Sequence, residues 1–245
     1  MTTKNKIRLL LFLVAMLPIA FGSCSQTSSK VKYGDGNVVK HTMAINYFDE
    51  IDLSGSFNVR LTQGTDLQAV IETDKNLQEL VELEVKGNTL YVSTVGDAIL
   101  RPTRMDLFIT YPQLRRFSIG GACKIGSDQV IVSDALTFDI SGAAEIDLGI
   151  ETQVLNTRLS GAGNITLEGS AREHFISLSG ASNLQAEKLI TETTHIELSG
   201  AGSAQVFASE FLKAHLSGVG SIRYHGNPSS TQINKSGLGI IKKAN

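Results

Sequence analysis

The sequence predicts an all-β protein, a right-handed parallel β-helix with coils of about 19 residues. Two observations carry this prediction: a short phrase that returns at nearly constant spacing, and strict alternation of apolar and polar residues around it. The phrase is Leu-Ser-Gly-Ala-Gly or a close variant, and its third residue recurs every 18 to 21 positions. These corner glycines are Gly121, Gly142, Gly161, Gly180, Gly200, Gly218 and Gly237.

The columns of the repeat predict two short strands in each coil, joined at the glycine. Residues two and four positions before the glycine are mostly apolar, the residue between them is mostly polar, and the alternation resumes after the glycine. We expect the glycine to adopt a backbone conformation that other residues would strain, and the following alanine to sit inside the bend. Successive coils then stack as parallel strands with right-handed crossovers.

The N-terminal half carries a weaker form of the same pattern. The stretch IDLSGSFNVRL matches the repeat column for column and supplies an eighth corner glycine, Gly55. Further on, VELEVKGNTLYVS is typical of a hairpin. We therefore predict one continuous β domain over 46–245, with irregular first coils in 46–116 and regular repeats in 117–245.

The first residues indicate export. Three basic residues precede the apolar run LLLFLVAMLPIAF, and small residues lead to a cysteine, which predicts a lipoprotein signal peptide over 1–23 with lipid on Cys24. The polar residues that follow predict a flexible tether over 24–45. The lipid would hold the protein on a membrane of the cell envelope, most simply the outer membrane. The segment SQTSSK lacks an acidic tract, which favours the periplasmic face without deciding it.

Composition narrows the partners. Cleavage after residue 23 leaves 19 basic residues against 24 acidic ones, a net charge of −5, and no basic stripe points to nucleic acid. With Cys24 lipidated, Cys123 has no partner for a disulfide, and we expect it to be a small buried residue.

Candidate chemistry is sparse along the repeats. The pairs Asp139 with Arg158 and Glu197 with His215 fall in neighbouring coils and predict exposed ion pairs. Asn164 and Asn183 fall in register and predict an amide ladder, as the serine column predicts a hydroxyl ladder, with sugar binding as the sharper alternative. The histidines do not align as a metal site, and Tyr224 and Phe207 do not form an aromatic stripe. The sequence therefore predicts no catalytic, cofactor-binding or metal-binding residue, and no cofactor.

Several motifs carry a resemblance. FDEIDLSGSFNVRLTQG, VKGNTLYVS, YPQLRRFSIGGA and the LSGAG series resemble the family called putative auto-transporter adhesin, head GIN domain. The resemblance implies a right-handed β-helix, often on lipoproteins of Bacteroides-like bacteria, and transfers no functional residue.

Three functions follow from these observations. The first is a non-enzymatic envelope lipoprotein whose rigid wall binds a glycan or an envelope protein. The second is a polysaccharide lyase or hydrolase, suggested by fold analogy. The third is a structural or assembly protein of the envelope.

Overall fold

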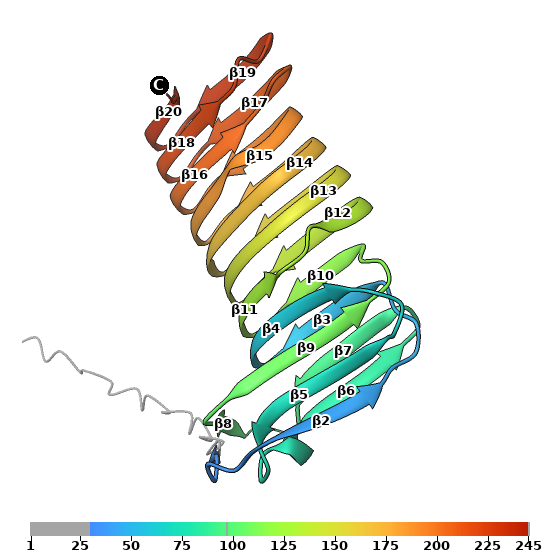
Figure 1. Cartoon of the computed structure of the whole chain (residues 1–245). Coiled ribbons are helices and arrows are strands. Elements are labelled where there is room, and N and C mark those ends of the chain that lie inside the picture. The colour runs from blue at the N-terminus through green and yellow to red at the C-terminus, as the bar shows by residue number, and fades with distance from the viewer. Residues whose placement is uncertain (1–29, 97, 245) are drawn as a thin grey trace, which may run out of the picture.

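The computed structural model describes residues 30–96 and 98–244 as a β-solenoid of about seven turns, which confirms the predicted fold class (Figure 1). Strands of successive coils stack in parallel about 19 residues apart. For example, Asp139 pairs with Arg158, and Arg158 with Ser177. The predicted signal peptide and Cys24 lie outside the described residues. No helix in the described part of the chain is long and apolar enough to cross a membrane.

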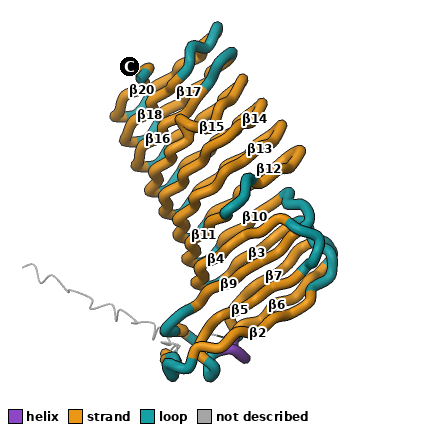
Figure 2. The backbone as a smooth tube through the Cα atoms, viewed as in Figure 1, coloured by secondary structure: helices purple, strands orange, loops and turns teal. Residues whose placement is uncertain are grey.

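Each coil has two principal faces. The first face, formed by strands that precede the corner glycine, contains β7 (Thr89–Thr94), β3 (Glu50–Ser54), β10 (Arg116–Ile119), β17 (Phe211–Leu216) and β19 (Ser230–Lys235). The second face, which follows the glycine, contains β9 (Met105–Tyr111), β4 (Ser56–Gln63), β11 (Ala122–Ser127), β16 (Ala201–Phe207), β18 (Val219–His225) and β20 (Leu238–Lys243). In the middle coils the strands continue around the opposite bend, as β12 (Ile131–Ile140), β13 (Ala143–Leu159), β14 (Ala162–Leu178) and β15 (Ala181–Leu198) (Figure 2).

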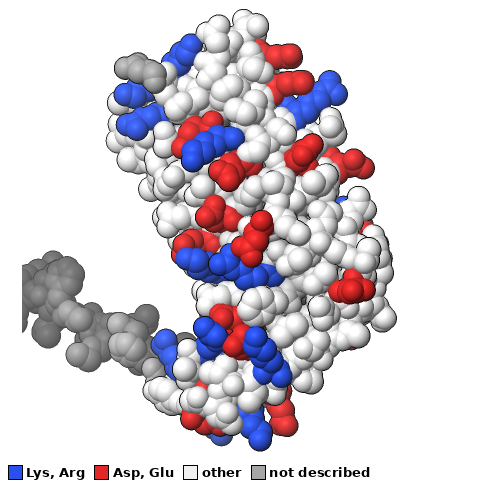
Figure 3. Space-filling view, in the orientation of Figure 1, with Lys and Arg blue, Asp and Glu red and all other residues white. Residues whose placement is uncertain are grey.

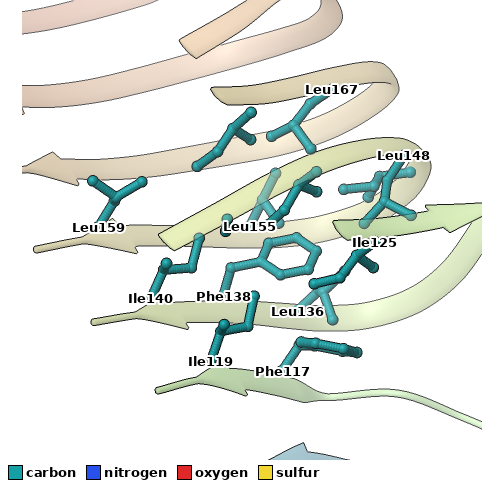
Figure 4. Packing of buried hydrophobic residues seen from close by; sticks show 14 of the residues in the cluster. Phe117, Ile119, Ile125, Leu136, Phe138, Ile140, Leu148, Leu155, Leu159 and Leu167 are labelled. Carbon is teal, nitrogen blue, oxygen red and sulfur yellow. The ribbon is translucent and has the colours of Figure 1, made fainter. Parts of the chain in front are cut away.

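Inward side chains of both faces form one continuous core. Figure 4 shows Phe117 and Phe138 pointing into the interior from successive coils, and their ring centroids lie 6.4 Å apart. Isoleucine and leucine fill the neighbouring inward columns, as at Ile119, Ile140 and Leu159, which are all buried. The alternation read from the sequence therefore separates core from surface correctly along the regular coils.

The corner glycines stand at the predicted turns, but for a different reason from the one expected. None of the seven repeat glycines has a positive φ. Instead, a Cβ built on Gly161 would overlap the carbonyl oxygen of Gly142, and the same relation recurs from coil to coil. That carbonyl accepts a hydrogen bond from the Ala162 N–H at 3.0 Å. Coil stacking, rather than local backbone strain, therefore demands glycine.

The neighbours of the corner glycine also differ from expectation. The alanine after it faces solvent, as at Ala143 and Ala162, so its predicted place inside the bend was wrong. The next residue points inward where space is narrow, which explains Ala144 and the buried Cys123. Burial raises the pKa of the Cys123 thiol to about 11, so this free cysteine stays protonated.

The predicted hydroxyl ladder is present, since Ser160 Oγ donates to the Ile140 carbonyl at 3.4 Å and other serines repeat the bond.

A cap of mainly antiparallel strands closes the N-terminal end of the solenoid. It contains β1 (Val31–Tyr33), β2 (Val38–Ala44), β5 (Gln68–Asp74), η1 (Gln78–Leu80), β6 (Val81–Lys86) and β8 (Ile99–Arg101). Strand β5 pairs antiparallel with β9 and with β2, while β6 forms the predicted hairpin with β7. The first coils are therefore less regular than the later ones, because antiparallel strands cover the end of the parallel stack.

The cap corrects the predicted tether. Residues 31–33 and 38–44 form strands, although the sequence analysis assigned 24–45 to a flexible segment. The buried Asp74 holds the loop between them, because its carboxylate accepts hydrogen bonds from the Gly36 and Thr103 N–H groups at 2.8 and 2.7 Å. The sequence does not indicate these strands, because the segment begins with the polar stretch SQTSSK and contains Gly34-Asp35-Gly36, and β1 and β2 bury little of their surface.

Candidate functional site

The first face carries an outward column five residues before each corner glycine, and this column forms the candidate site. Its members in consecutive coils are Phe175, His195 and Lys213, which are paired in register. Their side chains point away from the core because the inward positions on either side of Phe175 are filled by His174 and Ile176. Phe211 lies two residues before Lys213 on the same outward side of β17.

Three rings of this surface pack against one another. The rings of Phe175 and His195 are stacked, with centroids 5.0 Å apart and planes at 18°. Phe211 approaches His195 at 5.5 Å with an interplanar angle of 57°. All three side chains are half-buried, so ring surface remains open to solvent. We call Phe175, His195 and Phe211 the aromatic patch.

A hollow of about 260 Å³ lies beside Phe175 and His195. Its other walls include the charged side chains of Arg158, Glu197 and Lys213. Arg158 is oriented by Asp139, which accepts from its Nη1 at 3.3 Å. The hollow therefore combines open ring surface with both hydrogen-bond donors and acceptors.

The His195 side chain in the aromatic patch is a neutral imidazole. Partial burial and the nearby Lys213 ammonium lower its pKa below the ordinary value, against the opposing charge of Glu173. Near pH 7 the imidazole is therefore uncharged and offers a flat face together with one donor and one acceptor. Aromatic faces with adjacent polar groups suit ligands that are apolar on one side and hydroxylated on the other, as sugar rings are.

The predicted surface pairs are partly present. Asp139 and Arg158 form the expected exposed ion pair, while Glu197 and His215 lie in register without an ion pair between them among the described residues. Asn164 and Asn183 also lie in register, but among the described residues no hydrogen bond joins their side chains, and Asn183 Oδ1 instead accepts from Ser203 Oγ at 2.7 Å. In the described ranges no group of three His, Cys, Asp or Glu side chains could hold a metal ion.

The aromatic patch was not predicted from the sequence. Tyr224 and Phe207 were the aromatic residues considered for a stripe, but the rings that meet are on β14, β15 and β17. A signal was available, because Phe175 and His195 each precede a corner glycine by five residues. Phe211 could not be found in this way, since it precedes its glycine by seven.

The fold and the corner motifs agree with one protein family. The family model described as putative auto-transporter adhesin, head GIN domain, matches residues 47–228. The chain belongs to this family. The resemblance read from the sequence is thereby confirmed, and the head GIN domain covers most of the solenoid and part of the cap. No curated protein matches the sequence.

Solved structures show a similar fold. A putative adhesin from Bacteroides fragilis is similar with a TM-score of 0.84 at 28% identity, covering 87% of this chain and 100% of that one. A putative adhesin from Parabacteroides merdae gives 0.70 at 20% identity, covering 89% and 100%. A protein from Parabacteroides distasonis named as a putative lipid binding protein gives 0.70 at 21% identity, covering 88% and 100%.

Proposed function

We propose that this head GIN protein is a non-enzymatic, lipid-anchored module of the cell envelope that binds glycans in an adhesin-like role. The observation that carries the proposal is the aromatic patch, where Phe175, His195 and Phe211 present ring faces beside Arg158 and Lys213. Stacking on rings combined with a few directed hydrogen bonds is a common way to hold a polar ligand on an open surface. The adhesin description of the family supports this class of role.

The solenoid gives the patch a fixed geometry. Phe175, His195 and Lys213 sit on adjacent parallel strands, which are spaced by about 4.8 Å. Such a row matches an extended oligosaccharide better than a single small molecule. Because the backbone is already rigid, binding would cost little ordering of the protein.

The anchor is the second part of the proposal. The signal-like residues before Cys24 support lipidation there, and export to the envelope, with the outer membrane as the expected site. Radiolabelled palmitate incorporation, compared between the wild type and Cys24→Ser, tests the lipid. Protease treatment of intact cells tests whether the domain faces outward.

The experiment for the binding role uses residues 24–245 with Cys24→Ser on a panel of polysaccharides and glycoproteins. We expect saturable binding that falls at least tenfold in Phe175→Ala and Phe211→Ala. Phe108→Ala is the matched control, because Phe108 is an exposed aromatic on β9 of the other face. Unchanged binding in both patch variants would reject the patch as the site.

A polysaccharide-cleaving enzyme is the alternative, and chain shortening is measured in the same samples. A second hollow on the first face, of about 480 Å³, contains Asp52 and Asp139, and burial raises the pKa of Asp52. A glycosidase needs one carboxyl group as acid and another as base or nucleophile. Both oxygens of Asp139, however, face guanidinium groups of Arg116 and Arg158 at 3.3 Å. The geometry thus favours binding over cleavage.

A further inference from the structure

In the part of the chain that the structure describes, no cap covers the last coil of the solenoid, in contrast with the N-terminal end. Among the described residues, strand β19 pairs only with β17, and β20 only with β18, so each has one edge without a described partner strand. Aliphatic side chains are exposed at this end: Val219 by 59%, Leu238 by 79% and Ile240 by 57%. We call these three residues, together with Arg223, Lys242 and Lys243, the C-terminal tip.

Charge is strongly polarised toward the tip. Residues 211–245 contain five basic residues and no acidic one, whereas residues 24–210 contain 14 basic and 24 acidic residues. Figure 3 shows Lys and Arg side chains along the upper left of the molecule near the C-terminus, with acidic residues on the opposite upper side. Within the described chain no carboxylate lies within salt-bridge distance of the three tip cations. Lys243 donates instead to Asn227 Oδ1 at 3.0 Å.

The tip is amphipathic along its strands. On β20, Leu238, Ile240 and Lys242 are alternate residues and therefore project from the same side of the sheet. On β18, Val219 pairs with Leu238, and Arg223 pairs with Lys242. The aliphatic residues thus gather at the corner, and Arg223 and Lys242 lie about 13 Å further along the strands, while Lys243 follows on the other side of β20. Cations at this distance can reach lipid phosphates when the aliphatic corner enters the membrane interface, which is 5–10 Å deep for apolar side chains.

We propose that the C-terminal tip docks, corner first, on a membrane surface that contains anionic lipids. Charge complementarity supports this occupant, because lysine and arginine near an anionic membrane each contribute about 1 kcal/mol, or about fivefold in affinity. Figure 1 places the tip at the opposite end of the molecule from the cap, which contains β1. A protein anchored near β1 would therefore present the tip to a second surface. The tip does not depend on the aromatic patch, and the two are tested separately.

Two other occupants fit less well. Lysines on an open sheet edge oppose pairing with a second copy, and this guarding role is common for edge strands. Protection of the edge by lysines does not explain the exposed aliphatic side chains. Leu238 and Ile240 project perpendicular to the sheet, so they lie on its face and not along its open edge. A peptide strand added at the edge would leave both of them exposed.

The test is vesicle co-sedimentation with residues 24–245 carrying Cys24→Ser, so that no acyl chain contributes. We expect binding to equimolar phosphatidylglycerol and phosphatidylcholine vesicles, little binding to pure phosphatidylcholine, and weakening as salt rises. The variants Leu238→Ser/Ile240→Ser and Lys242→Glu/Lys243→Glu should each bind at least tenfold more weakly. The matched controls are Val132→Ser/Ile190→Ser, which removes aliphatic side chains of similar exposure, and Lys75→Glu/Lys188→Glu.

A spectroscopic variant separates docking from folding. The chain contains no tryptophan, so Leu238→Trp adds a single reporter, with Ile190→Trp as its counterpart away from the tip. Docking predicts a blue-shifted emission of Leu238→Trp on phosphatidylglycerol vesicles and none for Ile190→Trp. Absence of wild-type binding to anionic vesicles, equal binding to both vesicle types, or an unshifted emission would each overturn the proposal.

Discussion

Gly161 lies directly above Gly142 in the stack of coils, so close that a side chain on Gly161 would overlap the Gly142 carbonyl oxygen. The same carbonyl accepts the Ala162 N–H, so it cannot move aside without breaking a ladder hydrogen bond. The glycine column is therefore a condition for parallel stacking at this spacing. This relation explains why the repeat is conspicuous in a chain whose other columns vary.

Gly161→Ala should destabilise the domain severely, by more than the ~1 kcal/mol of a typical substitution, because the coils must separate at the corner. Gly161→Val should be worse. Urea unfolding followed by circular dichroism measures both. Gly120→Ala is the matched control. Gly120 directly precedes the corner glycine Gly121, and a Cβ on Gly120 would meet nothing closer than the Leu53 carbonyl oxygen at 3.8 Å. A near-normal free energy of unfolding for Gly161→Ala would mean that the coils are not stacked as described.

The buried pair of His174 and Thr157 should make stability depend on pH. Thr157 Oγ1 lies 3.0 Å from His174 Nε2, and burial lowers the pKa of His174 to about 3. The unfolded chain takes up this proton near pH 6.5, well before the native state does. Stability conferred by a neutral His174 is therefore present above pH 6.5 and falls as pH drops toward 3, by up to about 1.4 kcal/mol per pH unit.

The double variant Thr157→Val/His174→Leu tests this linkage. Leucine occupies the equivalent inward position in the two preceding coils, at Leu136 and Leu155, and Thr194 occupies it in the next coil, before Leu212. We expect the double variant to lose less stability than the wild type between pH 7.5 and 4.5 in urea unfolding. His174→Leu alone should cost about 1–3 kcal/mol at pH 7.5, because it leaves the Thr157 hydroxyl buried without a partner. Parallel pH profiles for the wild type and the double variant would contradict the assignment.

Asp74 should stabilise the N-terminal cap by joining the loop at Gly36 to the segment at Thr103. Burial would raise its pKa, but hydrogen bonds from Thr103 and Gly36 outweigh burial and lower it. Its contribution is therefore present at neutral pH and is lost as pH falls through the lowered pKa. Asp74→Ala should speed amide exchange across 31–44 while leaving the solenoid coils protected, with Asp66→Ala as an exposed control. Exchange that rises equally in β14 would assign Asp74 to global stability instead.

The regular coils could be predicted because their signals are local. Alternation with period two identifies inward residues such as Ile146 and Ile165, and the repeat length alone sets their register. The cap could not be predicted in the same way. Strand β2 pairs with β5 across a stretch of sequence that has no repeat, and β2 buries little of its side-chain surface. The aromatic patch could be predicted only in part. Phe175 and His195 share a column of the repeat, but Phe211 on β17 lies two residues out of register with His195 and contacts it diagonally.

His195 offers the sharpest test of how the aromatic patch works. Its ring stacks on Phe175 and makes a tilted contact with Phe211, and its lowered pKa keeps it neutral at pH 7. If the ring contributes a stacking surface, His195→Phe should retain glycan binding within about threefold, while His195→Ala should lose at least tenfold. Binding should also be constant between pH 7 and 8, because no charge changes on this ring there. A role in proton transfer or charge recognition would instead make His195→Phe as weak as His195→Ala, and calorimetric titration of both variants with the same glycan distinguishes the two outcomes.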